Sequence, residues 1–172
     1  MRPALFLDRD GTLIVDVGYP RDPAQVELVP GAAAALAALP SEVALVIVTN
    51  QSGLARGRIT LAEAEAVEAE VAAQFAAAGV HFAGAYRCPH GPDDGCRCRK
   101  PAPGMLETAA AELGLELARS IMIGDKPSDV AAGRAAGCRA ALWFAAAPTA
   151  DAVDVIGWPA AGAQIAALLA LE

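Results

Sequence analysis

Two aspartates, Asp8 and Asp10, stand close together directly after the first apolar run of the chain. One carboxylate can act as a nucleophile, and a second one beside it can donate and accept the protons that a displacement moves. The pair alone is weak evidence, because an Asp-Gly-Thr sequence like residues 10–12 is often only a turn. Its meaning depends on the other polar groups that the fold brings to the same place.

Three more polar clusters follow later apolar runs, and with the two aspartates they make a set that suits phosphate chemistry. Hydroxyl and amide groups can hold phosphate oxygens, cations can neutralise their charge, and carboxylates can hold a metal ion. The clusters are Thr49, Asn50, Gln51 and Ser52; Arg99 and Lys100; and Asp125, Lys126 and Asp129. Each also has an ordinary explanation as a helix cap, a turn or a solvated charge. Their joint order of nucleophile, hydroxyl, lysine and acid favours a catalytic site.

A short Gly/Pro-rich stretch contains a dense group of possible metal ligands. These are Cys88, His90, Cys96 and Cys98. Three thiolates and one imidazole form the ligand set of a closed tetrahedral zinc site, which leaves no position open for water or substrate. In a reducing compartment such a cluster favours a metal, with a disulfide or free thiols as the alternative. We therefore predict a structural Zn²⁺ that orders the loop at about residues 88–100 and aims Arg99 and Lys100.

Short apolar runs alternate with alanine-rich segments of helical periodicity along the chain. The predicted strands cover residues 4–7, 43–48, 83–86, 121–123 and 139–144, and the predicted helices cover residues 31–39, 61–78, 104–113, 129–136 and 160–169. Thr60 and Glu63 form a capping box before the second helix, and Pro127 or Ser128 can open the fourth. This alternation predicts an α/β fold, a three-layer Rossmann-like parallel sheet with helices on both faces. Ligands bind beyond the carboxyl ends of such strands, where the polar clusters stand.

The composition limits the kind of protein. The chain has 172 residues, of which 55% are hydrophobic and 19% are charged, so we expect one folded domain over residues 1–172. No apolar run approaches the roughly 18 residues of a membrane span, and the first residues do not form a signal peptide. We therefore expect a cytoplasmic protein without a membrane partner. The net charge of −7 argues against nucleic acid as a partner. We expect a monomer that acts on a small molecule.

The polar clusters also carry a family resemblance. The chain is similar to phosphatases of the haloacid dehalogenase (HAD) superfamily, whose four motifs are matched by Asp8-Arg9-Asp10-Gly11-Thr12, Thr49, Lys100 and Gly124-Asp125. Within the superfamily it resembles the D-glycero-D-manno-heptose 1,7-bisphosphate phosphatases. That closer resemblance rests on Gly18-Tyr19, Pro30-Gly31, residues 49–57, Cys88-Pro89-His90, residues 96–101 and Gly124-Asp125-Lys126. The histidinol-phosphate phosphatases are the alternative, since they share the zinc loop but typically lack a continuation like residues 52–57.

The resemblance implies a HAD-like fold without a separate cap domain and a reaction through an aspartyl phosphate. It implies that Asp8 is the nucleophile and that Asp10 is the general acid and base. Thr49 and Lys100 are then the residues that bind the phosphoryl oxygens. The implied Mg²⁺ ligands are the Asp8 carboxylate, the backbone carbonyl of Asp10, and Asp125. Asp129 either orients Lys100 or a metal-bound water, or is an ordinary first-turn acid that faces the helix dipole.

The resemblance also implies a sugar bisphosphate substrate and a set of contacts to it. These are Asp16, Val17, Gly18, Tyr19, Asn50, Gln51, Ser52, Arg99 and Lys126. The second phosphate of such a substrate is a dianion, which Arg99 and Lys126, helped by Arg56, can hold by charge-assisted hydrogen bonds. The plain alternative is that these are exposed, solvated cations.

Two other classes of protein share part of the pattern. A receiver-type signalling domain also places a phosphorylatable aspartate, a threonine and a lysine at strand ends, but it has no use for Asp10 or the cysteine loop. A zinc-stabilised binding module without activity requires defective catalytic acids, whereas every expected group is present here. Steady release of phosphate from a sugar phosphate separates an enzyme from both.

Overall fold

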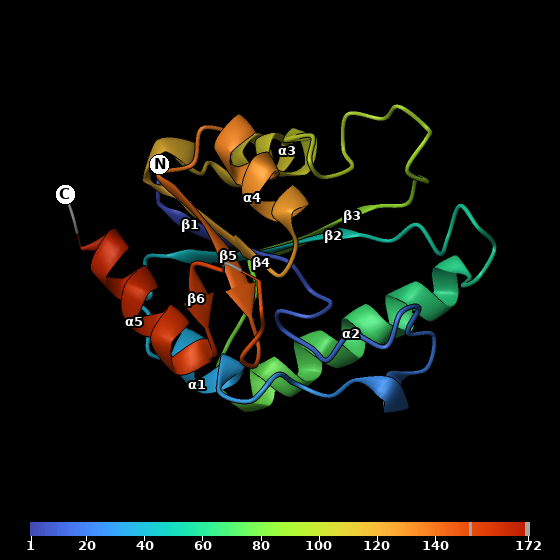
Figure 1. Cartoon of the computed structure of the whole chain (residues 1–172), viewed down its shortest axis with the longest axis horizontal. Coiled ribbons are helices and arrows are strands. Elements are labelled where there is room, and N and C mark those ends of the chain that lie inside the picture. The colour runs from blue at the N-terminus through green and yellow to red at the C-terminus, as the bar shows by residue number, and fades with distance from the viewer. Residues whose placement is uncertain (152, 171–172) are drawn as a thin grey trace.

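A six-stranded parallel sheet forms the middle layer of the molecule (Figure 1). The structure, a computed structural model, describes residues 1–151 and 153–170. The strands are β1 (Ala4–Leu7), β2 (Ala44–Asn50), β3 (Gly84–Cys88), β4 (Ile121–Gly124), β5 (Ala140–Ala145) and β6 (Val155–Ile156), and their order in the sheet is β3-β2-β1-β4-β5-β6. The order reverses between β1 and β4. In sheets of this type ligands bind beside the carboxyl ends of the strands at that point.

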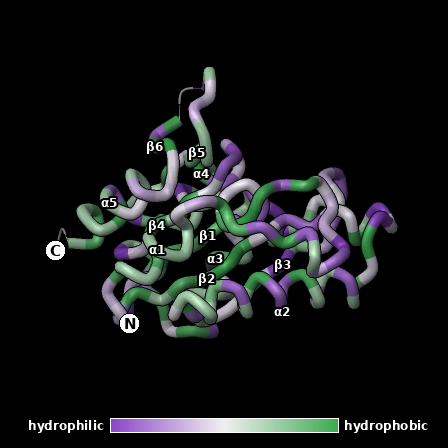
Figure 2. Tube along the Cα trace, turned by 90° about the horizontal axis from the view of Figure 1, so that it is seen from below, coloured by the Kyte–Doolittle hydropathy of each residue, from purple (hydrophilic) through white to green (hydrophobic). Residues whose placement is uncertain are grey.

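Helices cover both faces of the sheet (Figure 1). They are α1 (Ala32–Ala37), α2 (Leu61–Ala77), α3 (Gly104–Leu113), α4 (Pro127–Ala135) and α5 (Trp158–Leu169). Side chains alternate along β1, so that Leu5 and Leu7 pack with residues of α1, α2 and α5 in one core, while Phe6 packs with residues of α3 and α4 in the other. Figure 2 shows the result along the trace, where hydrophobic residues dominate the central strands and hydrophilic residues recur along α2.

The predicted fold class is confirmed: the molecule is a three-layer α/β structure with a parallel sheet. Each of the five predicted strands and five predicted helices is present, with ends shifted by a few residues. The sequence-based prediction missed β6, whose two residues are too few for a periodic pattern. It also missed two short 3-10 helices, Pro23–Gln25 and Leu117–Arg119.

Helix ends follow the predicted capping signals. Thr60 and Glu63 form both hydrogen bonds of a capping box at the start of α2. Helix α4 begins at Pro127, preceded by Lys126, whose backbone amide donates to Asp129 at 2.9 Å. Helix α5 begins at Trp158, earlier than predicted, where the buried indole Nε1 donates to the carbonyl of Thr12 at 2.7 Å.

In the described residues, only a 3-10 helix and the short α1 lie between β1 and β2, so no separate cap domain covers the sheet edge there. The second connection that could hold a cap, between β2 and β3, is α2 with its flanking loops. The carboxyl ends of the strands therefore face a cavity that is walled mainly by loops. Among the same residues, no helix combines the length and apolarity needed to cross a bilayer.

Candidate active site

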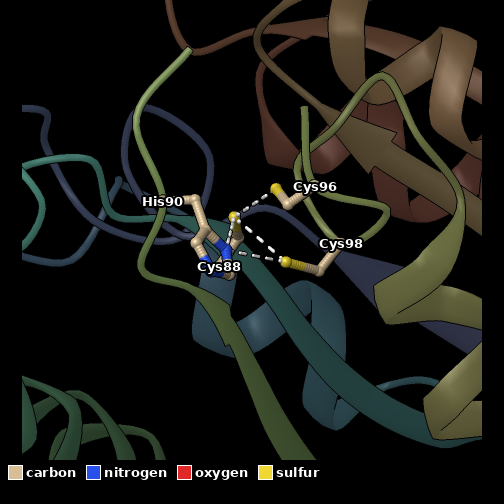
Figure 3. A group of neighbouring side chains, drawn as sticks. All are labelled: Cys88, His90, Cys96 and Cys98. Carbon is tan, nitrogen blue, oxygen red and sulfur yellow. Dashed lines mark hydrogen bonds between the residues drawn. The ribbon is translucent and has the colours of Figure 1, made fainter. Parts of the chain in front are cut away.

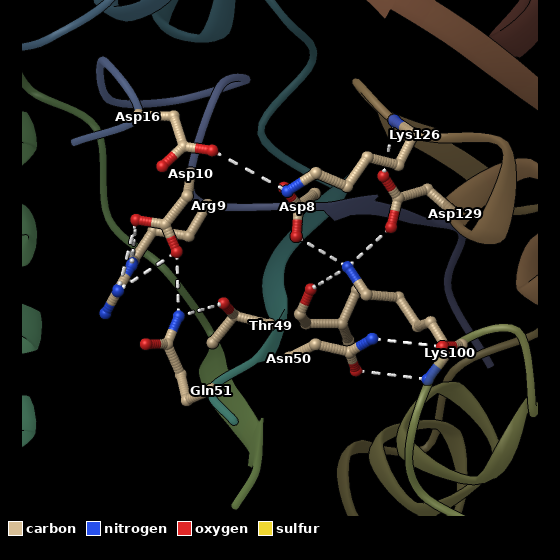
Figure 4. A network of polar contacts seen from close by, with 11 residues as sticks. Asp8, Arg9, Asp10, Asp16, Thr49, Asn50, Gln51, Lys100, Lys126 and Asp129 are labelled. Atoms are coloured by element: carbon tan, nitrogen blue, oxygen red, sulfur yellow. Dashed lines mark hydrogen bonds and ion pairs between the residues drawn. The ribbon is translucent and has the colours of Figure 1, made fainter. Parts of the chain in front are cut away.

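The polar side chains predicted at the strand ends converge at the reversal point of the sheet (Figure 4). Asp8 follows β1, Thr49 lies near the end of β2, and Asp125 follows β4. Lys100 reaches the same place from the loop between β3 and α3. Asp8, Thr49 and Asp125 lie at neighbouring strands because β1 pairs with both β2 and β4. Residues far apart in the sequence thus form one site.

Lys100 is the cation at the centre of this site. Its Nζ lies 2.6 Å from Asp8 Oδ1 and 2.7 Å from Asp129 Oδ1, and it donates to the carbonyl of Val48 at 2.8 Å. Burial alone lowers the pKa of Lys100, but the charges of Asp8 and Asp129 outweigh it and raise that pKa above its ordinary value. Lys100 is therefore an ammonium beside the proposed nucleophile.

Asn50 and Asp129 hold Lys100 in place. The Asn50 side chain donates to the Lys100 carbonyl at 3.0 Å and accepts from the Lys100 amide at 3.1 Å. Asp129 binds Lys100 with one carboxylate oxygen and the Lys126 amide with the other. Asp129 was predicted either to orient Lys100 or to be an ordinary acid in the first turn of a helix. It does both, since it bonds Lys100 and also accepts from the amide that precedes α4. Asn50 was predicted to touch the substrate, but both ends of its amide bond the backbone of Lys100.

Asp10 sits between two donors. The Arg9 guanidinium contacts both of its carboxylate oxygens, at 3.1 to 3.2 Å, and Gln51 Nε2 donates to Oδ2 at 2.7 Å. Burial raises the pKa of Asp10, and the cation of Arg9 opposes that rise without cancelling it. A raised pKa suits a carboxyl that must carry a proton for part of a reaction. This role of Arg9 was not predicted, although a basic residue between two acidic ones is a visible signal in the sequence.

Three carboxylates form a possible metal site. Oxygens of Asp8, Asp125 and Asp129 lie within 4.8 Å of one another. Among the described residues, Oδ1 of Asp125 is buried without a hydrogen-bond partner. Burial and the nearby charge of Asp8 raise the pKa of Asp125 to about 7. A cation at this place would satisfy the orphaned oxygen and relieve the repulsion, and an all-oxygen donor set suits Mg²⁺. Both oxygens of Asp129 are already bonded, one to Lys100 and the other to the Lys126 amide, whereas Asp8 contacts Lys100 through Oδ1 alone. Asp8 and Asp125 are therefore the available ligands.

The backbone around Asp125 leaves no spare room. Trp143 Nε1 donates to the Asp125 carbonyl at 3.0 Å. Gly11 has a φ of +83°, and a Cβ at this position would collide with the carboxylate of Asp125. Glycine at position 11 therefore lets β1 and β4 bring Asp8 and Asp125 together.

The four predicted zinc ligands do come together (Figure 3). The Cys88 sulfur lies 3.7 Å from that of Cys96 and 3.3 Å from that of Cys98, and His90 Nδ1 lies 3.6 Å from the Cys88 sulfur and 3.2 Å from the Cys98 sulfur. A tetrahedral zinc with Zn–S bonds of about 2.3 Å separates its sulfur ligands by roughly 3.8 Å. The cysteines are free thiols, and the cluster fits a closed zinc site.

We expect zinc to hold this loop. A Cys98→Ser variant should lose the metal and unfold at least about 5 °C lower, because a loss of roughly 2 kcal/mol shifts the Tm of a chain of this size by that much. Metal analysis and thermal unfolding check the result. Cys138→Ser is the matched control, since Cys138 lies outside the cluster and should keep one zinc per chain. Wild-type protein purified without chelator and without zinc would contradict the prediction.

A cavity of about 750 Å³ opens beside the catalytic groups. Seven of the predicted substrate contacts line it: Asp16, Gly18, Tyr19, Asn50, Ser52, Arg99 and Lys126. The wall also includes Pro92, Ala102 and Ser128, which were not predicted to contact the substrate. The zinc loop forms one side, and Arg99 is tied to it by a bond from Nη1 to the His90 carbonyl at 3.2 Å.

Three predicted substrate contacts are not among the described residues that line the cavity. They are Val17, Gln51 and Arg56. Val17 points to solvent with 48% of its surface exposed. Arg56 Nη1 lies 3.4 Å from the hydroxyl of Tyr19, so Arg56 contacts a residue that lines the cavity. Tyr19 packs closely on Gly53, where a Cβ would lie 2.6 Å from the ring. The side chain of Gln51 turns inward to Asp10 and Thr49.

Comparison with known proteins agrees with this geometry. Residues 97–165 match the HAD-hydrolase-like family model. The D-glycero-β-D-manno-heptose-1,7-bisphosphate 7-phosphatase of Salmonella typhi is 40% identical over 166 residues, which cover 91% of this chain and 88% of that protein. The corresponding protein of Vibrio cholerae is 42% identical over 144 residues, which cover 79% of this chain and 77% of that protein.

Two solved structures extend the comparison. The D,D-heptose 1,7-bisphosphate phosphatase of B. bronchiseptica, complexed with magnesium and phosphate, has a TM-score of 0.82 at 32% identity and covers 95% of this chain and 97% of its own. The phosphatase of the same description from Burkholderia thailandensis has a TM-score of 0.59 at 28% identity, with coverage of 80% and 76%. The fold, the site and the sequence agree, and the chain belongs to the HAD-type phosphatase family of the D-glycero-β-D-manno-heptose-1,7-bisphosphate 7-phosphatases.

Proposed function

We propose that the protein hydrolyses D-glycero-β-D-manno-heptose 1,7-bisphosphate to the monophosphate by removing the 7-phosphate. The observation that carries the proposal is the match to phosphatases of this activity over 91% of the chain. The site supports it, because a nucleophilic carboxylate, a buried ammonium and a proton-transfer carboxyl lie at one end of the cavity.

In the proposed reaction, a carboxylate oxygen of Asp8 forms a bond to phosphorus while the bond from phosphorus to the sugar oxygen breaks. Asp10 gives its proton to the departing oxygen. A water molecule then attacks the aspartyl phosphate, Asp10 takes a proton from it, and phosphate leaves with the Asp8 carboxylate restored. Thr49 donates to a phosphoryl oxygen, and the ammonium of Lys100 neutralises charge on the phosphoryl group.

Mg²⁺ fits the acid cluster and would be held by Asp8, Asp125 and the backbone carbonyl of Asp10. When bound, it shields the negative charges of the nucleophile and the phosphate from each other. Two neighbouring side chains hold the residues around this metal site. The Trp143 indole donates to the backbone carbonyl of Asp125, and Lys100 forms an ion pair with Asp129.

The second phosphate of the substrate needs cations farther along the cavity. Arg99 and Lys126 both line the wall, and Lys126 Nζ lies 3.7 Å from Asp16 Oδ2. That ion pair is exposed and long, so a phosphate dianion can replace the carboxylate at little cost. The fixed position of Arg99 on the zinc loop favours substrates whose two phosphates are separated by a sugar. Monophosphates lack this second interaction.

The substrate assignment is tested by comparing kcat/KM for four compounds: the β and α anomers of the heptose bisphosphate, fructose 1,6-bisphosphate and histidinol phosphate. We expect the β anomer to be preferred, with histidinol phosphate at least about 100-fold poorer, because the cations for the second phosphate would be left unpaired. The position of the remaining phosphate on the product shows which ester was cleaved. A preference for histidinol phosphate would overturn the assignment.

Three statements about the whole protein are also proposals. We propose that residues 1–172 form one domain, supported by the single sheet that spans the described elements. We propose a monomer, since the proposed nucleophile, the lysine and the proton-transfer carboxyl all come from one chain. We propose a cytoplasmic site of action, because a reducing compartment keeps free thiols such as Cys88 and Cys98 available to zinc.

A further inference from the structure

Gln51 lies directly after β2, and its side-chain amide points to Asp10 and Thr49 (Figure 4). Only 3% of the residue is exposed. Its Nε2 donates to Asp10 Oδ2 at 2.7 Å and to Thr49 Oγ1 at 2.8 Å. One amide nitrogen therefore bridges two residues that have different tasks in the proposed reaction. A direct contact with substrate, as the sequence analysis predicted for Gln51, does not fit this orientation.

The chemistry of the neighbours decides which end of the amide faces them. Asp10 is a carboxylate held by the Arg9 guanidinium on both oxygens. When ionised, a carboxylate only accepts hydrogen bonds, so the NH₂ end of Gln51 must point at it. One hydrogen of that NH₂ group goes to Asp10, and the other goes to Thr49. The hydroxyl of Thr49 is then an acceptor from Gln51.

This bond constrains the proton of Thr49. A hydroxyl has one hydrogen to donate, and a donor already occupies the side that faces Gln51. In the described part of the chain, the Thr49 hydroxyl donates no hydrogen bond. The proton is thus left to point into the site, where the proposed reaction requires a donor for a phosphoryl oxygen.

We propose that Gln51 is a positioning residue for phosphoryl transfer, which holds the carboxyl of Asp10 and orients the hydroxyl of Thr49 through one amide group. The inference rests on the proposed function, because it assigns roles to Asp10 and Thr49 in that reaction. It adds a residue that acts only through its neighbours. Gln51 is buried and its amide nitrogen bonds both residues, and this fixed position keeps both groups aligned as the phosphate enters and leaves.

A purely structural role for Gln51 predicts something different. If the amide only satisfies buried polar groups, its removal lowers stability and affects all substrates alike. If Gln51 acts through Asp10, the loss depends on the leaving group. A sugar alkoxide needs a proton as it departs, whereas a nitrophenolate departs without one. The dependence on leaving group therefore separates positioning from packing.

The test is a Gln51→Met variant, which keeps the size of the side chain and removes both donors. Steady-state kinetics are measured with the heptose bisphosphate and with p-nitrophenyl phosphate, and thermal unfolding is followed in parallel. We expect kcat for the sugar phosphate to fall by roughly 10- to 100-fold with KM changed by less than about threefold. The loss for p-nitrophenyl phosphate should be several-fold smaller. Gln74→Met on α2 is the matched control, because Gln74 bonds Glu70 and the Val26 carbonyl instead.

A double variant tests the arm through Thr49. The Gln51→Met substitution should lower kcat less in a Thr49→Val background than in the wild-type background. The reason is that Thr49→Val has already removed the hydroxyl that Gln51 orients. The proposal is overturned by an unchanged kcat, by a rise in KM alone, or by equal losses with both substrates. Wild-type protein that ignores the heptose bisphosphate but cleaves another sugar phosphate would refute the proposed substrate. The comparison of leaving groups then still tests Gln51 with that sugar phosphate.

Discussion

An Asp8→Asn variant should fold normally and release almost no phosphate, with kcat lower by at least about 10⁴-fold. The amide of asparagine has nearly the shape of the carboxylate and can still accept a hydrogen bond from Lys100, which lies 2.6 Å from Asp8. It is, however, too weak a nucleophile to form the phosphorylated intermediate. One negative charge also leaves the crowded acid cluster with Asp125 and Asp129, so stability is retained. Phosphate release and thermal unfolding measure the two effects.

The same variant also serves to locate the covalent step. With substrate labelled in its phosphate, wild-type protein quenched during turnover should carry the label on the peptide that contains Asp8, and Asp8→Asn should carry none. Asp22→Asn is the control, because Asp22 is exposed and asparagine caps a helix equally well. Label on another peptide, or activity within about 100-fold of wild type in Asp8→Asn, would refute the mechanism.

Replacing Lys100 with methionine should reduce both activity and stability. The ammonium is the only group within the described residues that bridges Asp8, Asp129 and the Val48 carbonyl. Without it, kcat should fall by about 10²- to 10³-fold, because the charge on the transferred phosphoryl group loses its neutralising cation. Two buried carboxylates also lose their partner, which should lower the free energy of unfolding by about 3–5 kcal/mol. Steady-state kinetics and urea unfolding check the prediction.

Lys126→Met provides the contrast. Lys126 and its ion pair with Asp16 are exposed, so the loss of Lys126 should raise KM for the bisphosphate and leave the free energy of unfolding nearly unchanged. A Lys100→Met variant that keeps wild-type stability would show that the ammonium is not the partner of the two acids. One that keeps kcat and raises only KM would move Lys100 from the transferred phosphate to substrate binding.

Much of the fold and the ligand sets followed from local sequence. The alternation of short apolar runs with helical segments predicted the layers, because side-chain periodicity reports which face of an element is buried. Thr60 with Glu63 predicted the start of α2, since both capping bonds join residues close in sequence. The zinc ligands were also readable, because all of them lie in one short loop. Strand β6 was missed because two residues are too few to show the alternation of a strand.

The tertiary structure alone decided what each polar group at the strand ends touches. Lys100 meets Asp8 across a sequence separation of 92 residues, and Asn50 clamps the backbone of Lys100 across 50 residues. The side chain of Gln51 turned out to bond Asp10 and Thr49 without lining the cavity, whereas Val17 points to solvent. Residue type and spacing determine the chemistry that a chain offers. The direction of each side chain depends on strand register and on neighbours distant in sequence, and those become defined only when the sheet and its helices pack.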